Sequence, residues 1–360
     1  MSSVERPSRH VHFVGTVPAK DSGAAIDLML EEAGPQLKTV PDGETGRPDY
    51  VTDLVIGLRD HPAVKHVIPG LLPGRLRNFF DLPVYTLKDA KALTPESLKL
   101  GYADEALGSW PVFLERKAAA VEAGTAAPDL RFQVGIPGDL QLPFMAFKAA
   151  GFDEAHQRPF QEATAEEIRT IHAGTDGHVV IQLEVPTETV LTAYTPRAAR
   201  AAVADRFARR IAALVRATPD AVTYGIHACN IDMNKKSLLP AVSTHATMTL
   251  AGAIIKNWPD DRAPIEFFHL PLARGDRQPR FNDRLVGQLG TVEFPETTRV
   301  IVGMAHDQQP RDVQAAGLRA IDRAVGRTVD VSATCGLGRL RHEPERVVAN
   351  IRRTVELAQK

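Results

Sequence analysis

The sequence predicts a single (β/α)8 barrel with a long insertion between its second and third strands. Eight short, apolar runs rich in β-forming residues occur along the 360 residues, and each ends in a polar turn. Helical patterns separate these runs. Strands that alternate with helices are parallel strands joined by crossovers, and eight of them close a barrel. No internal repeat or flexible linker divides the chain, so we expect one domain, 1–360.

The predicted strands can be taken in chain order. They are His10–Val14, Leu37–Val40, Phe132–Gly135, His178–Leu183, Val222–Ile226, Ile265–Phe268, Arg299–Val302 and Val329–Ser332. In a barrel of this kind the loops that follow the strands converge on one face, so polar residues far apart in sequence become neighbours there.

Helix start signals lie between these runs. Thr164 to Glu167 reads as a capping box, and Thr195-Pro196 opens a helix that extends to about Thr218. Further helices are expected from Asp312 to about Val325 and from Glu343 to Gln359, the latter amphipathic.

The segment from about residue 50 to 130 is the predicted insertion. It contains expected helices at Thr94 to about Leu107 and at Val112 to Ala123, and an expected loop at Ile68 to Gly74. Whether it covers the barrel mouth or packs on its side is left open by the sequence.

Composition limits the classes of function. Lys and Arg number 43 against 44 Asp and Glu, so neither nucleic acid nor a membrane surface is an expected partner. The first fifteen residues lack the apolar core of a signal peptide, and no run of about eighteen apolar residues exists. Two cysteines cannot form a disulfide framework, which favours a reducing, cytoplasmic compartment. The oligomeric state stays open.

Both cysteines follow predicted strands, which suggests a metal site. His227 and Cys229 end the fifth strand, Glu266 lies in the sixth, and Cys335 follows the eighth. Two thiolates, an imidazole and a carboxylate can form a tetrahedral zinc shell. Two alternatives remain: the cysteines could be inert core residues, and His269 could replace Glu266 as a ligand.

These elements, in this order, resemble the zinc-binding pattern of the catalytic domain of cobalamin-independent methionine synthase. That family is a (β/α)8 barrel within the superfamily that also contains uroporphyrinogen decarboxylases. Other strand ends are similar too. The matching segments are Gly15-Thr16-Val17-Pro18, Asp42-Gly43-Glu44 with Arg47 and Asp49, Gln182-Leu183-Glu184-Val185-Pro186, and Gly303 with Pro310-Arg311.

The resemblance implies a Zn²⁺ ion held by His227, Cys229, Glu266 and Cys335, which binds a substrate thiol, lowers its pKa and presents a thiolate to an alkyl donor. The expected activity is zinc-dependent alkyl transfer, most simply of methyl, to or from a small thiol. The resemblance places Gly15, Thr16, Glu44 and Glu184 at the substrate. In the loop after the sixth strand, Arg274 is a hypothetical ligand for an anionic substrate group, although loop arginines are often simply solvated.

The sequence also departs from that family. Gln308 stands where the family has its acid histidine, so His306 or Asp307 would have to donate the proton. The stacking tryptophan after the third strand is missing, which puts folate binding in doubt. A specialised relative is therefore expected, and an epoxyalkane:coenzyme M transferase-like thiol addition is an alternative. A metal-free lyase of the decarboxylase branch and a non-catalytic zinc-binding relative are further alternatives.

Overall fold

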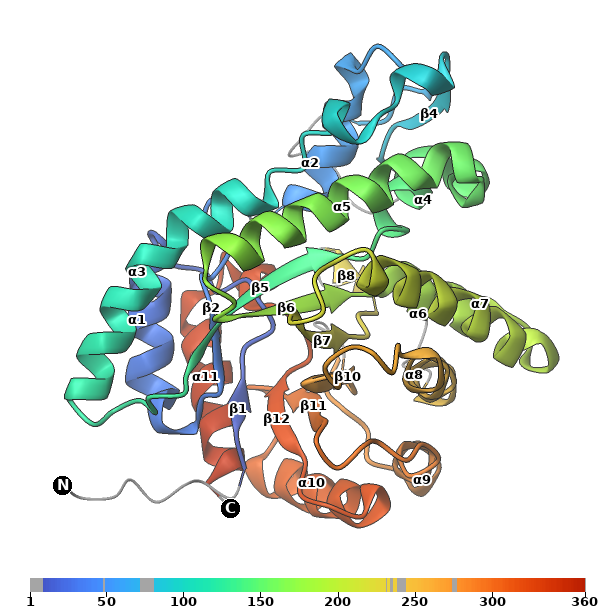
Figure 1. Cartoon of the computed structure of the whole chain (residues 1–360). Coiled ribbons are helices and arrows are strands. Elements are labelled where there is room, and N and C mark those ends of the chain that lie inside the picture. The colour runs from blue at the N-terminus through green and yellow to red at the C-terminus, as the bar shows by residue number, and fades with distance from the viewer. Residues whose placement is uncertain are drawn as a thin grey trace.

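Eight parallel strands form the centre of the molecule, as the computed structural model shows. It describes residues 9–47, 49–71, 81–230, 232–233, 236–237, 244–273 and 277–359. The strand order is β1-β12-β11-β10-β7-β6-β5-β2, and a parallel bridge between Val11 and Leu37 connects the two edges (Figure 1). This arrangement confirms the predicted (β/α)8 barrel.

All eight barrel strands overlap the runs predicted from the sequence. Their bounds are β1 Val11–His12, β2 Thr39–Pro41, β5 Arg131–Pro137, β6 Val179–Glu184, β7 Thr223–His227, β10 Phe267–Pro271, β11 Arg299–Ala305 and β12 Asp330–Ala333. Two short antiparallel hairpins lie outside the barrel. They are β3 Val64–Ile68 with β4 Val84–Leu87, and β8 Asp232–Met233 with β9 Lys236–Ser237.

Helices surround the barrel (Figure 1). The longer ones are α1 Ser22–Ala33, α3 Tyr102–Glu122, α5 Glu154–Gly174, α7 Arg197–Arg216, α8 Thr244–Asn257, α10 Arg311–Val325 and α11 Pro344–Ala358. The shorter ones are α2 Tyr50–Gly57, α4 Gln141–Phe147, α6 Pro186–Tyr194 and α9 Asp283–Leu289. None of the described helices is both long and apolar enough to cross a membrane.

The capping box expected at Thr164 does not start a helix, because α5 already begins at Glu154. Thr164 is buried in the middle of α5, between the equally buried Ala163 and Ala165. The apolar face of α5 begins with Phe160, and burial of that face extends the helix past a local start signal. The other predicted starts, near Thr195, Asp312 and Glu343, lie within three residues of α7, α10 and α11.

The segment predicted as an insertion divides into two parts. Its second part is the continuous helix α3, which carries Pro111 inside it and packs against α1 and α5 as one of the barrel's own helices. The expected start at Thr94 caps only a 3-10 turn, Pro95–Ser97. The first part, α2 with the β3–β4 hairpin, contacts α4 and lies beyond the end of the sheet (Figure 1). Of the expected loop at 68–74, residues 72–74 lie outside the described residues.

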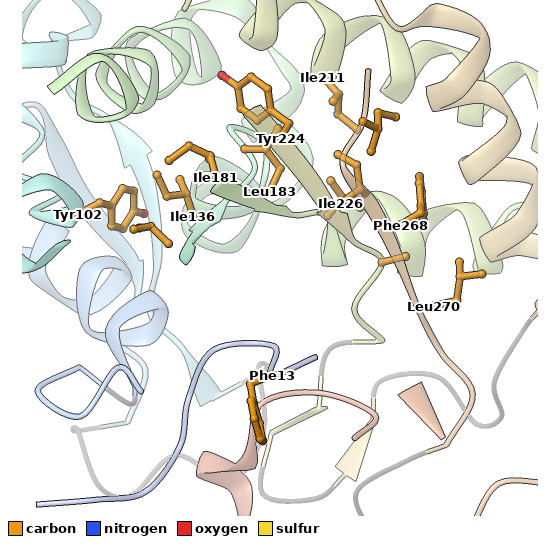
Figure 2. Packing of buried hydrophobic residues seen from close by; sticks show 14 of the residues in the cluster. Phe13, Tyr102, Ile136, Ile181, Leu183, Ile211, Tyr224, Ile226, Phe268 and Leu270 are labelled. Atoms are coloured by element: carbon orange, nitrogen blue, oxygen red, sulfur yellow. The ribbon is translucent and has the colours of Figure 1, made fainter. Parts of the chain in front are cut away.

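Side chains alternate between the two faces of the barrel wall, as the period of a strand requires. Outward residues such as Leu183, Ile226 and Phe268 are fully buried beneath the helices (Figure 2). Burying each such side chain stabilises the fold by roughly 1.5–3 kcal/mol. Inward, Val180, Phe267 and Ile301 form a small apolar layer. Two residues further along the same strands, the inward positions are Gln182, His269 and Gly303, so a polar layer begins toward the carboxyl ends.

Candidate metal centre

Three of the four predicted metal ligands meet at the carboxyl ends of β7 and β12. The Sγ atoms of Cys229 and Cys335 are 3.7 Å apart, and Cys335 Sγ lies 3.5 Å from Nε2 of His227. All three ligand atoms lie within 4.8 Å of one another. Both cysteines are free, and their separation is far above the roughly 2.05 Å of a disulfide bond.

These separations match the edges of a zinc tetrahedron. Bond lengths of about 2.3 Å for Zn–S and about 2.0–2.1 Å for Zn–N, at tetrahedral angles, place two sulfurs about 3.8 Å apart and a sulfur and a nitrogen about 3.6 Å apart. The donor set of two thiols and one imidazole also suits zinc. Three protein ligands leave a fourth position for a substrate, which is the arrangement of catalytic zinc sites.

Backbone contacts hold the two ligand loops in place. After β7 the chain turns at once, because the Cys229 amide donates to the carbonyl of His227 at 3.0 Å. After β12, the Leu337 amide donates to the carbonyl of Thr16 at 2.7 Å. A Cβ atom at Gly338 would lie 2.4 Å from Cγ2 of Thr16. The Cys-Gly-Leu-Gly sequence therefore allows the ligand loop to dock on the loop that follows β1.

The two thiols differ in their acidity. A hydrogen bond with the Cys229 thiol lowers the pKa of Cys335 although burial opposes it, and the charge of Arg339 lowers it further. The same hydrogen bond, together with burial, raises the pKa of Cys229. Binding of a metal ion would displace the thiol protons of both residues.

Behind His227 lies His269, on the neighbouring strand β10. Their Nδ1 atoms are 2.6 Å apart, and Nε2 of His269 lies 2.5 Å from Oγ of Ser332. Both rings are fully buried. Among the described residues, His269 is not part of the group whose ligand atoms could share one metal ion. The sequence-based alternative of His269 as a ligand therefore finds no support in this geometry.

The expectation that Glu266 completes the metal shell is wrong. Glu266 precedes β10, and its amide donates to the carbonyl of Tyr224 at 2.7 Å, near the start of β7. Its carboxylate lies 3.3 Å from Arg131 and 3.8 Å from Arg299, which begin β5 and β11. Because His269, not Glu266, pairs with His227, Glu266 lies three residues, or about 10 Å, toward the amino end of the barrel.

The predicted substrate residues form a second cluster around two carboxyl groups. A Cβ built on Gly135 would lie 3.0 Å from Glu44 and 3.4 Å from Glu184, so both carboxyl groups converge above this glycine. Thr16 donates to Oε2 of Glu44 at 2.5 Å. Oε1 of Glu44 is buried and has no hydrogen-bond partner among the described residues. The structure thus brings Thr16, Glu44 and Glu184 together, and their role in binding a substrate stays a prediction.

Burial and proximity make these carboxyl groups weak acids. Burial raises the pKa of Glu44 to about 7, against the opposing effect of Arg47. Burial, followed by the negative charge of Glu44, raises the pKa of Glu184 as well. Cys335 raises both pKa values further, so the carboxyl groups and the metal ligands share one electrostatic environment. A positively charged ligand group would relieve this repulsion.

A strained turn presents Glu44 to the site. Its φ is 50°, in the left-handed region that non-glycine residues rarely adopt, and its amide donates to Oδ1 of Asp42 at 2.9 Å. Arg47 holds Asp42 with two hydrogen bonds, of 2.9 and 3.2 Å, and Ser109 donates to the same carboxylate. Asp42 and Arg47 therefore support the turn, which fixes the direction of the Glu44 side chain.

His306 and Asp307, the predicted proton donors, follow β11 and line a small cavity with Cys335. Although burial opposes it, hydrogen bonds from Arg346 and Asn350 lower the pKa of Asp307. A carboxylate held in this way is a poor proton donor. Burial lowers the pKa of His306, and its Nδ1 accepts a hydrogen bond from the Gln308 amide at 3.3 Å. Proton donation by His306 stays a prediction, and Arg274 lies outside the described residues.

Solved structures of known proteins share this fold. A putative vitamin-B12-independent methionine synthase from Listeria monocytogenes has a TM-score of 0.52 and 13% identity, with 94% of this chain and 86% of that chain covered. A B12-independent methionine synthase from Shewanella sp. W3-18-1, in complex with selenomethionine, has a TM-score of 0.56 and 15% identity, with 97% and 96% covered. The chain has the fold of these methionine synthase structures. No protein-family model and no curated protein matches the sequence.

Gly15 offers a direct test of the carboxyl cluster. A Cβ at this position would lie 2.7 Å from Oε1 of Glu44, inside any normal contact distance. We expect Gly15→Ala to displace the Glu44 carboxyl group and to destabilise the protein by roughly 1–3 kcal/mol, as overpacking does. Denaturant unfolding measures this loss. Gly108→Ala, where a Cβ meets nothing within 4 Å, is the matched control, and equal stability of the two variants would contradict the prediction.

Proposed function

We propose that the protein is a zinc-dependent transferase that moves an alkyl group, most simply methyl, to or from a small-molecule thiol. Two distances carry this proposal, the 3.7 Å between the cysteine sulfurs and the 3.5 Å between Cys335 and His227. They fit a zinc tetrahedron with one position free for a substrate. The likeness to methionine synthase structures supports the fold that the proposal requires.

Zinc at this position would supply the charge that deprotonates a substrate thiol, whose ordinary pKa is about 8.5. Cys229 and Cys335 contribute two anionic sulfur ligands, which keep the site electron-rich. His227 contributes a neutral nitrogen, and its burial excludes water from one side of the site. These ligands favour a substrate that becomes a strong nucleophile at neutral pH without a general base.

Glu44 and Glu184 suggest that the thiol carries a cationic group, such as an ammonium. The two carboxyl groups converge over Gly135, and Oε1 of Glu44 lacks a partner among the described residues. The positive charge of an ammonium group would balance the negative charge of the two carboxyl groups, and one of its N–H groups would donate the missing hydrogen bond. The Shewanella structure holds selenomethionine, which is an amino acid with an alkylated selenium atom, and this is consistent with the proposed substrate class.

Removal of zinc tests the proposal directly. We expect a strong chelator to abolish alkyl transfer and added Zn²⁺ to restore it, because the substrate thiol then loses its activating charge. X-ray absorption at the zinc edge should show two sulfur ligands in the resting protein and a third when an amino thiol such as homocysteine is added. Full activity in the chelated protein would refute zinc dependence. An unchanged sulfur shell with every thiol tried would refute thiol binding at the metal.

A further inference from the structure

Four polar groups form a continuous line through the buried interior of the barrel, from the candidate metal ligand His227 to the backbone of β12. His227 Nδ1 lies 2.6 Å from His269 Nδ1, and His269 Nε2 lies 2.5 Å from Ser332 Oγ. Ser332 Oγ donates in turn to the carbonyl of Ala333 at 2.5 Å. His227, His269 and Ser332 are each fully buried, so water cannot substitute for these contacts.

One arrangement of protons completes every contact of the line when His269 is neutral. The Ser332 hydroxyl donates to the Ala333 carbonyl, and His269 Nε2 carries a hydrogen that faces Ser332 Oγ and, at 3.3 Å, the same carbonyl oxygen, which can only accept. His269 Nδ1 then carries no hydrogen and must accept from His227 Nδ1. The hydrogen on Nδ1 leaves Nε2 of His227 with its lone pair free, and Nε2 is the atom that lies 3.5 Å from Cys335.

The surroundings of His269 keep its ring neutral and in place. The ring is fully buried, and burial favours the uncharged form of an imidazole. The ring packs over Gly303, where a Cβ would lie 2.8 Å from Nε2. The ring of His12 lies 5.8 Å away, between centroids. A neutral, immobile imidazole can accept a hydrogen bond in one fixed direction.

We propose that His269 is a positioning residue, which together with Ser332 holds the ring and the proton of His227 so that Nε2 faces the metal. This inference rests on the zinc site proposed above. It gives the polar layer of the barrel a function in addition to packing, because histidine ligands are oriented by the group that binds their other nitrogen. It also assigns to His269 a role behind the metal shell instead of within it.

Replacement of His269 tests the proposal by metal affinity, which needs no knowledge of the substrate. We expect His269→Phe to fill the space but to weaken zinc binding by roughly 10–100-fold, the usual effect of losing such a support. Competition with a chelator of known zinc affinity measures this change. His269→Gln keeps an acceptor for His227 and a donor for Ser332, so it should recover part of the affinity. Wild-type affinity in His269→Phe would overturn the proposal.

A second variant keeps the test decisive if His269→Phe fails to fold. Ser332→Ala removes only a hydroxyl group, and we expect it to weaken zinc binding and to alter the visible absorption spectrum of the cobalt-substituted protein. Thr218→Val is the matched control, because it removes a buried hydroxyl near the amino end of β7, bonded to Tyr224 and the carbonyl of Val215. The control should lose stability without losing metal affinity. Equal zinc affinity in Ser332→Ala and the control would overturn the proposal.

X-ray absorption separates a positioning role from a ligand role. Zinc in the wild-type protein should have one imidazole in its shell, and this count should not change in His269→Gln. Two imidazoles in the wild type, with one lost in the variant, would make His269 a ligand and overturn the proposal. If the wild-type protein binds no zinc at all, the proposed function itself fails, and this outcome is distinct from zinc binding that does not depend on His269.

Discussion

Replacing Cys335 by serine is expected to abolish zinc binding while the barrel stays folded. Cys335 is the ligand shared by both measured edges of the tetrahedron, to Cys229 at 3.7 Å and to His227 at 3.5 Å. A serine hydroxyl does not deprotonate as a thiol does and is a far weaker zinc ligand. We expect zinc affinity to fall by more than about 100-fold, which is more than the loss of a residue that only orients a ligand would cause. Alkyl transfer should disappear with the zinc. Metal analysis after dialysis measures the zinc content per chain.

Glu266→Gln is the matched control for this experiment. The sequence predicted Glu266 as a zinc ligand, whereas the structure pairs it with Arg131 and Arg299 at the amino end of the barrel. The control should therefore retain zinc and lose only a little stability, because its carboxylate is partly exposed. Retention of zinc by Cys335→Ser, or loss of zinc from Glu266→Gln, would refute the three-ligand centre described for His227, Cys229 and Cys335.

Replacing Glu44 by glutamine is expected to stabilise the protein at alkaline pH and to impair substrate binding. Burial raises the pKa of Glu44 from 4.5 to about 7. Because the folded state binds this proton more tightly than the unfolded state, Glu44 reduces the free energy of unfolding as pH rises from about 4.5 to about 7. Above about pH 7 the ionised Glu44 lowers the free energy of unfolding by the full amount, on the order of 3 kcal/mol, and Glu44→Gln removes this loss.

Denaturant unfolding at a series of pH values tests this prediction. The stability gained by Glu44→Gln over the wild type should be small near pH 4 and should grow until about pH 8. Glu122→Gln, on the exposed end of α3, should show no such trend. If the gain in the free energy of unfolding did not depend on pH, the loss of stability in the wild type could not come from ionisation of Glu44. In the same variant, affinity for an ammonium-bearing thiol should fall, because one of the two carboxyl groups is lost.

The barrel could be predicted from the sequence because each of its strands coincides with a short apolar run of consecutive residues. Each predicted run overlaps an observed strand, since fully buried parallel strands are short apolar runs with little alternation. Helix boundaries were less predictable. The signal at Thr164 is a valid local start, but α5 begins ten residues earlier because burial of Phe160 extends it. The two helices expected between Thr94 and Ala123 are the single helix α3, preceded by a 3-10 turn.

The ligands of the metal centre could be predicted only in part, because the sequence does not show the register in which the strands pair. His227 and Cys229 could be placed at a strand end because they follow an apolar run directly. Glu266 could not be placed correctly from the sequence, because β10 begins two residues later than predicted and extends to Pro271. That shift of a few residues moves Glu266 to the opposite end of the barrel and places His269 beside His227. Ser332, which supports His269, carried no signal for this role in the sequence, and Gly303 was identified only through the family resemblance.

By itself, the sequence determined the eight strands, the convergence of their loops, and the identity of His227, Cys229 and Cys335 as a set of donors that suits zinc. Only the tertiary structure decided which side chains lie at the same level of the barrel. It removed Glu266 from the centre, added His269 and Ser332 behind it, and brought Glu44 beside Glu184. The physical reason is that a strand is predicted from the apolar pattern of residues adjacent in the chain. The height of a side chain along the barrel, and its neighbours there, depend instead on the hydrogen-bond register between strands that are distant in sequence.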